Sequence, residues 1–554
     1  MARSRLLVAS AWVALAWIAS ISAASRPSFA EWAPKATTPE PAKAETPSEK
    51  KVETGAIPVP EAPAVADPLT AALRHKLGMP PATPTPAAPT EEDTRESAAL
   101  TAFYEGRNAA PLWVTPTGLN DRGKSAIAEI QNAGAYGLDA KAFFLPAPTD
   151  GSTPEMLAEA ELKLSAAALL YARHARGGRI MKPAEQLNSN LDRRPQLIDP
   201  KLVLDGLSSN DDTGAYLRSL HPKHAQFEKL RQAYVAALGS KTGSTDKPLN
   251  AAAKRLRANM EMWRWMNEDM GDVHVLNNIP EFMQYVYKGG EIIRTEKIVA
   301  GMLDKQSSIF SRPLKYVVLR PQWRVPESIK VHELWPSLRR GGGLMRQYAL
   351  QLETKDGKPL DWRKIDWSKD DIRNYEVIQP PGGISALGVV KFSFPSQHTI
   401  FMHDTPDKWM FRHSQRTLSH GCLRVKNPVE LAEIMLREGN GWDKARMLEQ
   451  MKSGPLNNEV VIEKRIPIHL TYFTAWVDGS GKLKTFSDIY GHEKRITQAL
   501  EGDWAKIAKG RDHLAAPQPN FNPKALVPQV AQQQRKRKLE TTGGIISDAL
   551  GLSF

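Results

Sequence analysis

The sequence predicts an α+β protein of several domains, in which a mostly helical domain precedes a β-rich domain that carries a long insertion. Stretches of strong helix formers ending at glycines occupy residues 96–248. From residue 272, β-branched and aromatic residues instead alternate with polar ones, which is typical of strands. With 554 residues, the chain is long enough for two or three domains with separate cores.

The N-terminus predicts export from the cytoplasm. Arg3 and Arg5 precede the apolar run LLVASAWVALAWIASISAA, which ends in small residues and is typical of a secretory signal peptide over residues 1–24. The run is also long enough to remain as an uncleaved anchor, which would tether the protein to a membrane. Residues 25–95 are rich in Pro, Ala, Thr, Glu and Lys and predict a disordered linker, with one short helix around PLTAALRHKL.

The helical region predicts a scaffold domain. Residues 96–248 show no metal-ligand or nucleophile pattern, so we expect a supporting or docking role. Residues 249–271 predict a linker helix whose methionine and tryptophan side chains face the next domain. Residues 513–554 are rich in Pro and Gln and contain QQQRKRKLE, which predicts a disordered basic tail.

The β-rich domain is expected over residues 272–495. Gly289 and Gly290 separate two alternating runs and predict a hairpin, and a closing hairpin is expected to turn at Asp478–Gly481. An insertion at about residues 326–382 is polar and contains several glycines. An insertion of that length in a β domain predicts a functional loop or lid rather than core.

The net charge restricts the class of partner. The chain carries a formal charge of +13 and a pI of about 9.5, which favours an anionic partner. Outside the cytoplasm nucleic acid is not expected, whereas a carboxylate-rich cell-wall polymer or a membrane surface fits the compartment.

Cys422 is the only cysteine of the chain. Exported proteins generally use cysteines in disulfide pairs, so a single one is either an intermolecular bridge, a free reactive thiol or a small buried apolar residue. Its surroundings, TLSHGCLRV, are polar and flanked by glycine and make a poor core. We therefore interpret Cys422 as a reactive thiol.

A thiol becomes nucleophilic when a nearby base removes its proton, and histidine is a common base. The run HTIFM predicts a strand that ends at His403, from which the chain returns to SHGC. Gly421 permits a tight turn and would leave its N–H, with that of Cys422, free to face a developing oxyanion. His398 and His413 are interpreted as surface or packing residues.

Two other readings use the same residues. A zinc site could employ the histidines and the cysteine, but their spacing lacks the paired pattern of a structural zinc site. In a papain-like protease the cysteine precedes its histidine by a long interval, whereas here His403 comes first and lies 19 residues before Cys422.

The motifs HDTP at 403–406 and SHGCLRV at 419–425 resemble the signature of L,D-transpeptidases, the YkuD-type enzymes of bacterial cell-wall synthesis. The likeness extends to VLNNIPEFMQYVY, RPQWRVPESI and QPPGGISALGVVKFSFP in the β-rich part. FYEGRNAAPLW and AGAYGLDAKAF, within residues 98–140, resemble the scaffold domain of the large periplasmic branch. The resemblance covers about residues 96–495.

This resemblance implies a role for each matched residue. Cys422 would be the nucleophile and His403 the base, with the imidazole oriented by the carbonyl of Asp404. Gly421 and Cys422 would form the oxyanion site. The remaining matched residues would support the site: Ser419 behind the turn, His420 at the oxyanion or substrate, and Arg424 at a substrate carboxylate or in a structural salt bridge.

The implied reaction is acyl transfer in the periplasm, without a metal or other cofactor. Cys422 would attack the bond between meso-diaminopimelate and D-Ala in a tetrapeptide stem, release D-Ala, and pass the acyl group to an amine of a second stem, which makes a 3–3 cross-link. The insertion would be the capping lid. The same acyl-enzyme could instead attach an outer-membrane protein or lipoprotein to peptidoglycan, or react with water as a carboxypeptidase. A non-catalytic wall-binding scaffold is a further alternative, which the intact motif disfavours.

Overall fold

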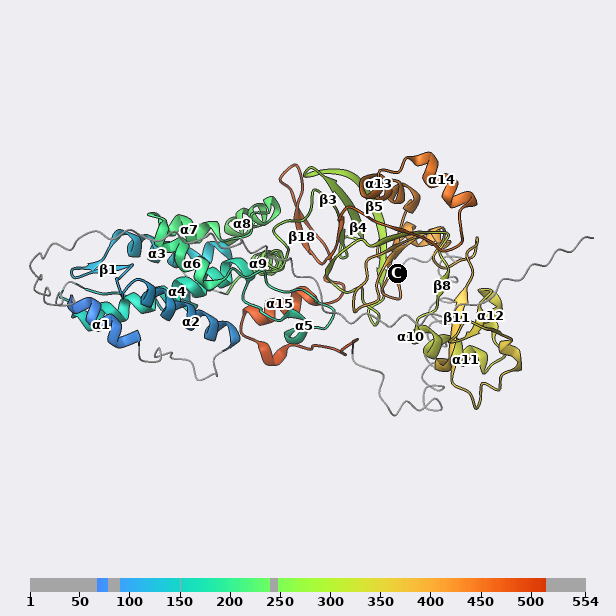
Figure 1. The fold of residues 1–554 in the computed structure, drawn as a ribbon, viewed down its shortest axis with the longest axis horizontal. Helices are drawn as coiled ribbons and strands as arrows, with labels where there is room; N and C mark the ends of the chain where they lie inside the picture. Colours follow the sequence, from blue (N-terminus) through green and yellow to red (C-terminus); the bar gives the residue numbers. More distant parts are fainter. Residues whose placement is uncertain (1–66, 78–89, 150, 240–247, 515–554) are drawn as a thin grey trace, which may run out of the picture. The chain divides into compact units, whose positions relative to one another are not determined.

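The computed structural model describes residues 67–77, 90–149, 151–239 and 248–514 (Figure 1). The expected signal peptide, most of the expected linker and nearly all of the expected basic tail therefore lie outside the described residues. No helix within the described ranges is long and apolar enough to cross a membrane.

The first large region is helical, as predicted. Its longest helix, α4 (Pro154–Gly177), is capped by the Thr153 side chain and followed by Gly178. The buried Glu161 of α4 accepts the hydroxyl of Tyr104 and hydrogen bonds from consecutive backbone N–H groups that begin at Leu112. Most of the other helices pack against α4 or one another: α2 (Glu91–Gly106), α3 (Asp121–Gln131), α6 (Pro200–Ser209), α7 (Thr213–Ser219), α8 (Ala225–Leu238) and α9 (Ala251–Arg264). The short helix α5 (Pro183–Gln186) follows α4 in the chain.

Within residues 25–95, the described residues are mainly helical, and the departure from the expected disordered linker is confined to the start of α2. Helix α1 (Pro68–Leu77) forms where a short helix was expected, and it buries Leu69 and Leu73. Their i, i+4 spacing places both leucines on one helix face, where burial offsets the polar composition around them. Helix α2 also begins earlier than expected, because Thr90 and Asp93 form a capping box.

The second region is built on one mixed sheet, which includes both predicted hairpin strands around Gly289 and Gly290. A separate hairpin, β18 (Ala475–Val477) and β19 (Leu483–Thr485), encloses the predicted turn at Asp478–Gly481. The main sheet runs in the order β16 (Asn458–Val461), β7 (Tyr316–Leu319), β12 (Val390–Ser393), β13 (Met402–His403), β15 (Leu423–Val425), β5 (Glu291–Gly301), β4 (Met283–Lys288), β3 (Val273–Asn278), β17 (Pro467–Thr471) and β6 (Ser311–Pro313), with β14 (Thr417–Ser419) beside β5.

One face of this sheet contributes to the main hydrophobic core. Phe392, Met402 and Leu423 of three neighbouring strands are fully buried there. Helix α13 (Pro428–Asn440) contacts β7 and β12 and adds Leu431 and Met435 to the same core. Because side chains alternate along a strand, the intervening residues point to the opposite face.

The insertion is a folded subdomain rather than an irregular loop. Four short strands form its sheet, in the order β10 (Pro359–Leu360), β9 (Gln351–Thr354), β11 (Tyr375–Gln379) and β8 (Trp323–Arg324). Helices α10 (Glu327–Ile329), α11 (Trp335–Leu338) and α12 (Gly343–Gln347) accompany them, with a π-helical turn at Lys330–Leu334 (Figure 1). The subdomain has a hydrophobic cluster of its own, which includes Trp335, Trp367 and Val377.

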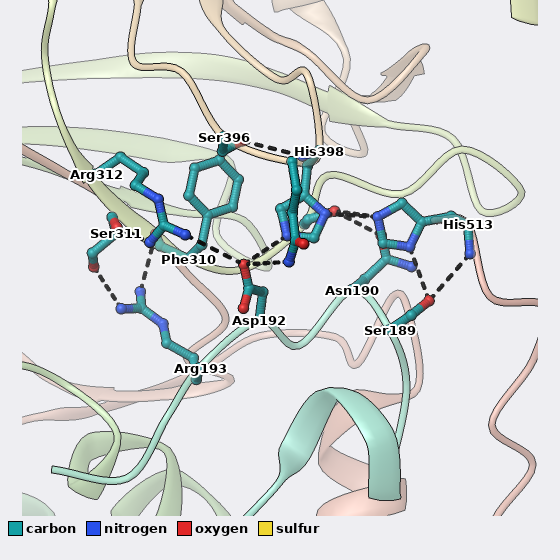
Figure 2. A network of polar contacts seen from close by, with 12 residues as sticks. Ser189, Asn190, Asp192, Arg193, Phe310, Ser311, Arg312, Ser396, His398 and His513 are labelled. Carbon is teal, nitrogen blue, oxygen red and sulfur yellow. Dashed lines mark hydrogen bonds and ion pairs between the residues drawn. The ribbon is translucent and has the colours of Figure 1, made fainter. Parts of the chain in front are cut away.

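A polar network joins three distant chain segments at the edge of the β-rich region (Figure 2). Asp192 Oδ2 lies 2.9 Å from His398 Nε2, and His398 Nδ1 lies 2.7 Å from His513 Nε2. His513 Nδ1 in turn lies 2.9 Å from the hydroxyl of Ser189. Arg193, beside Asp192, donates to the carbonyl of Leu470 in β17 at 2.7 Å. His513, expected in a disordered tail, is therefore held in place.

Candidate active site

The candidate nucleophile and base lie on adjacent parallel strands. In the pairing of β13 with β15, Met402 is opposite Leu423 and His403 is opposite Arg424. Met402 and Leu423 point into the core, so His403 and Cys422 are directed to the other face, offset by one residue. The structure thus brings the two predicted residues together on one face of the sheet.

His403 is held in the tautomer that a base requires. Its buried Nδ1 lies 2.5 Å from the carbonyl oxygen of Asp404, as expected. A carbonyl only accepts hydrogen bonds, so Nδ1 carries the proton and Nε2 keeps its lone pair. Burial lowers the pKa of His403 to about 3, and the neighbouring Arg424 and Lys391 cations act in the same direction. The imidazole is therefore neutral at ordinary pH.

Cys422 is half-buried, and its Sγ lies 4.0 Å from the carbonyl oxygen of Thr399. Burial raises the pKa of the thiol to about 11, although the backbone of Phe401 and the Lys391 and Arg424 cations oppose this effect. The resting pair is therefore a neutral thiol with a neutral imidazole. Nucleophilic attack then requires the proton to leave Sγ as the new bond forms, which is general-base catalysis.

The turn that carries Cys422 is fixed by Ser419. The Ser419 hydroxyl donates to the carbonyl of Cys422 at 2.5 Å and accepts the N–H of Gly421 at 3.2 Å. Gly421 has a φ of 113°, a conformation that L side chains rarely adopt. The expectation that the Gly421 N–H is free for an oxyanion is therefore wrong in this conformation, because Ser419 already accepts it.

Ser307 is a site residue that the sequence did not reveal. Its hydroxyl donates to the carbonyl of Gly421 at 2.6 Å and accepts the N–H of Gly301 at 2.9 Å. The hydroxyl of Tyr490 binds the carbonyl of the same Gly301 at 2.6 Å. Ser307 and Tyr490 are far from the cysteine motif in sequence, and no local pattern distinguishes them from other polar residues.

The side chain of His420 contacts the insertion. Its Nε2 lies 2.6 Å from Glu333 Oε1 in the π-helical turn, and the same oxygen lies 2.9 Å from Lys305 Nζ. Burial raises the pKa of Glu333, but the His420 hydrogen bond and the Lys305 cation outweigh it and bring the value to about 2. We therefore assign the His420 side chain to holding the insertion, in place of the expected oxyanion or substrate contact.

Arg424 and Asp404 are both engaged within the chain. Arg424 Nη1 lies 2.9 Å from both Asp407 Oδ2 and Thr405 Oγ1, which corresponds to the structural salt bridge among the two expected roles. The Asp404 carboxylate pairs with Lys408 and accepts the N–H of Val389 at 3.1 Å. Both residues hold the segment that follows His403.

The two remaining histidines lie apart from the thiol. His398 is buried in the network of Figure 2, and the exposed His413 packs edge-on against Trp409 at a centroid distance of 5.5 Å. Within the described ranges, no three His, Cys, Asp or Glu side chains converge closely enough to hold a metal ion.

Two family models match the chain. Residues 98–233 match the Scaffold domain, and residues 272–461 match the L,D-transpeptidase catalytic domain. A Haemophilus influenzae protein named "Putative L,D-transpeptidase" is 29% identical over 272 residues, which cover 49% of this chain and 53% of that protein. The match thus spans about half the length of this relative.

Two solved structures show a weaker likeness. An L,D-transpeptidase from Mycobacterium smegmatis is 13% identical, over 36% of this chain and 58% of that one, with a TM-score of 0.16. The Ldtfm–avibactam carbamoyl enzyme is 10% identical, over 44% of this chain and 80% of that one, with a TM-score of 0.17. Such low scores carry no information about the site.

Proposed function

This chain belongs to the L,D-transpeptidase family through the YkuD catalytic domain at residues 272–461, and we propose that it is a peptidoglycan L,D-transpeptidase that forms 3–3 cross-links. The observation that supports this most directly is the shared sheet face of His403 and Cys422, together with the tautomer of His403 that the Asp404 carbonyl fixes. Peptidoglycan stem peptides are the proposed substrates, and the periplasm is the proposed compartment.

The proposed reaction has two halves. In the first, Cys422 Sγ attacks the carbonyl between meso-diaminopimelate and D-Ala while its proton passes to His403 Nε2. Collapse of the tetrahedral intermediate breaks the amide bond, and the proton leaves with the D-Ala amine. In the second, an amine of another stem attacks the thioester, gives its proton to His403, and the thiol is restored.

The hydrogen bonds around the turn support this proposal. Ser307 and Ser419 fix the carbonyls of Gly421 and Cys422, so the thiol is presented in one position. Of the two backbone N–H groups expected to bind the oxyanion, that of Cys422 is the proposed donor, because Ser419 accepts that of Gly421. Through the contact of His420 with Glu333, the insertion is the proposed lid that keeps water from the thioester.

Purified protein incubated with disaccharide-tetrapeptides tests the proposal. Mass spectrometry should detect free D-Ala, an acyl adduct on Cys422 and a cross-linked dimer, and Cys422→Ala should abolish all three. Release of D-Ala and tripeptide without a cross-linked dimer would identify a carboxypeptidase. An adduct that is transferred only to an added envelope protein would identify protein attachment. If neither adduct nor D-Ala is seen, the enzyme proposal is wrong.

A further inference from the structure

A row of side chains crosses the sheet through the candidate site. The registers place Lys391 of β12 opposite His403, and His403 opposite Arg424. On the other side, Lys391 is opposite Val318 of β7, which is opposite Glu459 of β16. Directly paired residues point to the same face of a sheet, so two cations flank the imidazole on the face that carries Cys422.

The Lys391 ammonium is close to the reacting groups. It lies 4.7 Å from the centroid of the Phe401 ring, and that ring lies 5.5 Å from the ring of His403. Phe401 is also the residue whose carbonyl accepts the N–H of Leu423, directly after Cys422. Lys391, Phe401, His403 and Cys422 therefore form one patch.

The two cations of the row differ in their partners. Arg424 is neutralised by Asp407 and bound to Thr405. Lys391 is half-buried, and in the described part of the chain its ammonium makes neither an ion pair nor a hydrogen bond to a carboxylate. Glu459, the carboxylate on the same row, is separated from it by Val318.

An ammonium withdrawn from water without a counter-ion is costly. Burial accordingly lowers the pKa of Lys391, which Glu459 and Cys422 only partly oppose. The ring of Phe401 offers some compensation, since its π-face attracts a cation that lies over it. A ligand carboxylate beside Cys422 would remove the remaining cost.

We propose that Lys391 binds a free carboxylate of the donor stem, within one residue of the scissile carbonyl, and so selects donors that bear this charge. The inference rests on the proposed function and adds the group that orients the donor. Two carboxylates fit the chemistry: that of the terminal D-amino acid, and that of the D-centre of the diamino acid. Lys391 is a substrate-binding residue in this scheme, while Cys422 and His403 carry the chemistry.

The first test needs no natural substrate. Cys422, the chain's single thiol, is alkylated at pH 7.5 with iodoacetate, which carries a carboxylate, and with neutral iodoacetamide. We expect Lys391→Met to lower the ratio of the two rates about fivefold or more, Lys391→Arg to retain it, and the exposed Lys464→Met to leave it unchanged. The ratio cancels any change in thiolate fraction. An unchanged ratio in a folded Lys391→Met protein would overturn the proposal.

The second test uses three donors: the free tetrapeptide stem, one amidated at the terminal D-Ala, and one amidated at the diamino acid. Lys391→Met should raise KM for the free donor about tenfold. It should leave KM unchanged for the donor whose Lys391-bound carboxylate has been amidated, and that donor identifies which carboxylate Lys391 binds. An equal loss with all three donors would refute the proposal. If Lys391→Met lowers the ratio of the two alkylation rates but the wild-type protein turns over none of the three donors, the transpeptidase function is wrong and the carboxylate site is still supported.

Discussion

His420 Nε2 lies 2.6 Å from Glu333 Oε1, so the residue two positions before Cys422 is bound to the inserted subdomain. Lys305, on the loop after β5, binds the same oxygen at 2.9 Å. The contact gives the insertion a defined attachment beside the thiol, although its own core is separate from that of the sheet.

Glu333→Ala should loosen this attachment and admit water to the thioester. We expect the ratio of tripeptide to cross-linked dimer to increase several-fold, measured by mass spectrometry after incubation with tetrapeptide donor. Glu327→Ala, at an exposed position of the same insertion, is the matched control. An unchanged product ratio would show that the contact does not govern water access.

The same contact should resist mild acid. The folded-state pKa of Glu333 is about 2, below its ordinary value of 4.5, so its stabilising contribution is present above pH ~4.5 and disappears as the pH falls towards 2.

Ser307→Ala removes the hydroxyl that joins Gly301 to Gly421. A buried carbonyl left without its donor costs about 1–3 kcal/mol, and the Gly421–Cys422 turn should become less well fixed. We expect a lower free energy of unfolding and about a tenfold lower rate of Cys422 acylation. Ser453→Ala, at the exposed end of α14 (Lys444–Ser453), should change neither, and equal acylation rates would contradict the positioning role.

The pKa of Cys422 predicts an unusual alkylation profile. Because the folded-state value is raised to about 11, little thiolate exists at neutral pH. The rate with iodoacetamide should rise about tenfold per pH unit from pH 7 to 10, whereas the rate of an ordinary cysteine begins to level off above its pKa of ~8.5. Mass spectrometry of quenched samples measures the alkylation rate of Cys422 at each pH, with free N-acetylcysteine as the reference thiol. A plateau below pH 8 would indicate a thiolate–imidazolium pair instead.

Gly388→Ala should disturb the segment after His403. Gly388 has a φ of 58°, and an added Cβ would collide with the Asp404 carboxylate. We expect a loss of about 1–3 kcal/mol in unfolding free energy and slower acylation, since Asp404 also supplies the carbonyl that orients His403. Gly383→Ala is the control, because its Cβ would meet nothing within 4 Å. If both variants behave alike, the orienting contact tolerates displacement.

The His513 contact should weaken in acid. Burial, followed by the charge of His398, lowers the folded-state pKa of His513 to about 4 from its ordinary 6.5. The contribution of neutral His513 to the stability of the folded state is therefore present above pH ~6.5 and is lost as the pH falls towards 4. Hydrogen exchange of residues 507–514, corrected for its intrinsic rate, should accelerate between pH 7 and 5. His513→Gln should remove this pH dependence, and a pH-independent wild type would disprove it.

Features that depend on local pattern could be predicted from the amino-acid sequence. The change from helical to alternating periodicity at residue 272, the hairpin at Gly289–Gly290 and the short helix α1 are set by neighbours a few residues apart. The single cysteine and the histidine at a strand end identified the candidate pair, because unusual residues stand out without knowledge of the fold. The HDTP and SHGCLRV motifs did the same for the family.

The groups that surround that pair could not be predicted, because they come from distant parts of the chain. Strand register is chosen by burial across the whole sheet, so no local pattern could place Lys391 opposite His403 or Ser307 beneath Gly421. The Gly421 N–H was expected to be free because the sequence does not show that Ser419 turns back to accept it. His420 was likewise assigned from its distance along the chain to Cys422, while its partner Glu333 lies 87 residues away in sequence.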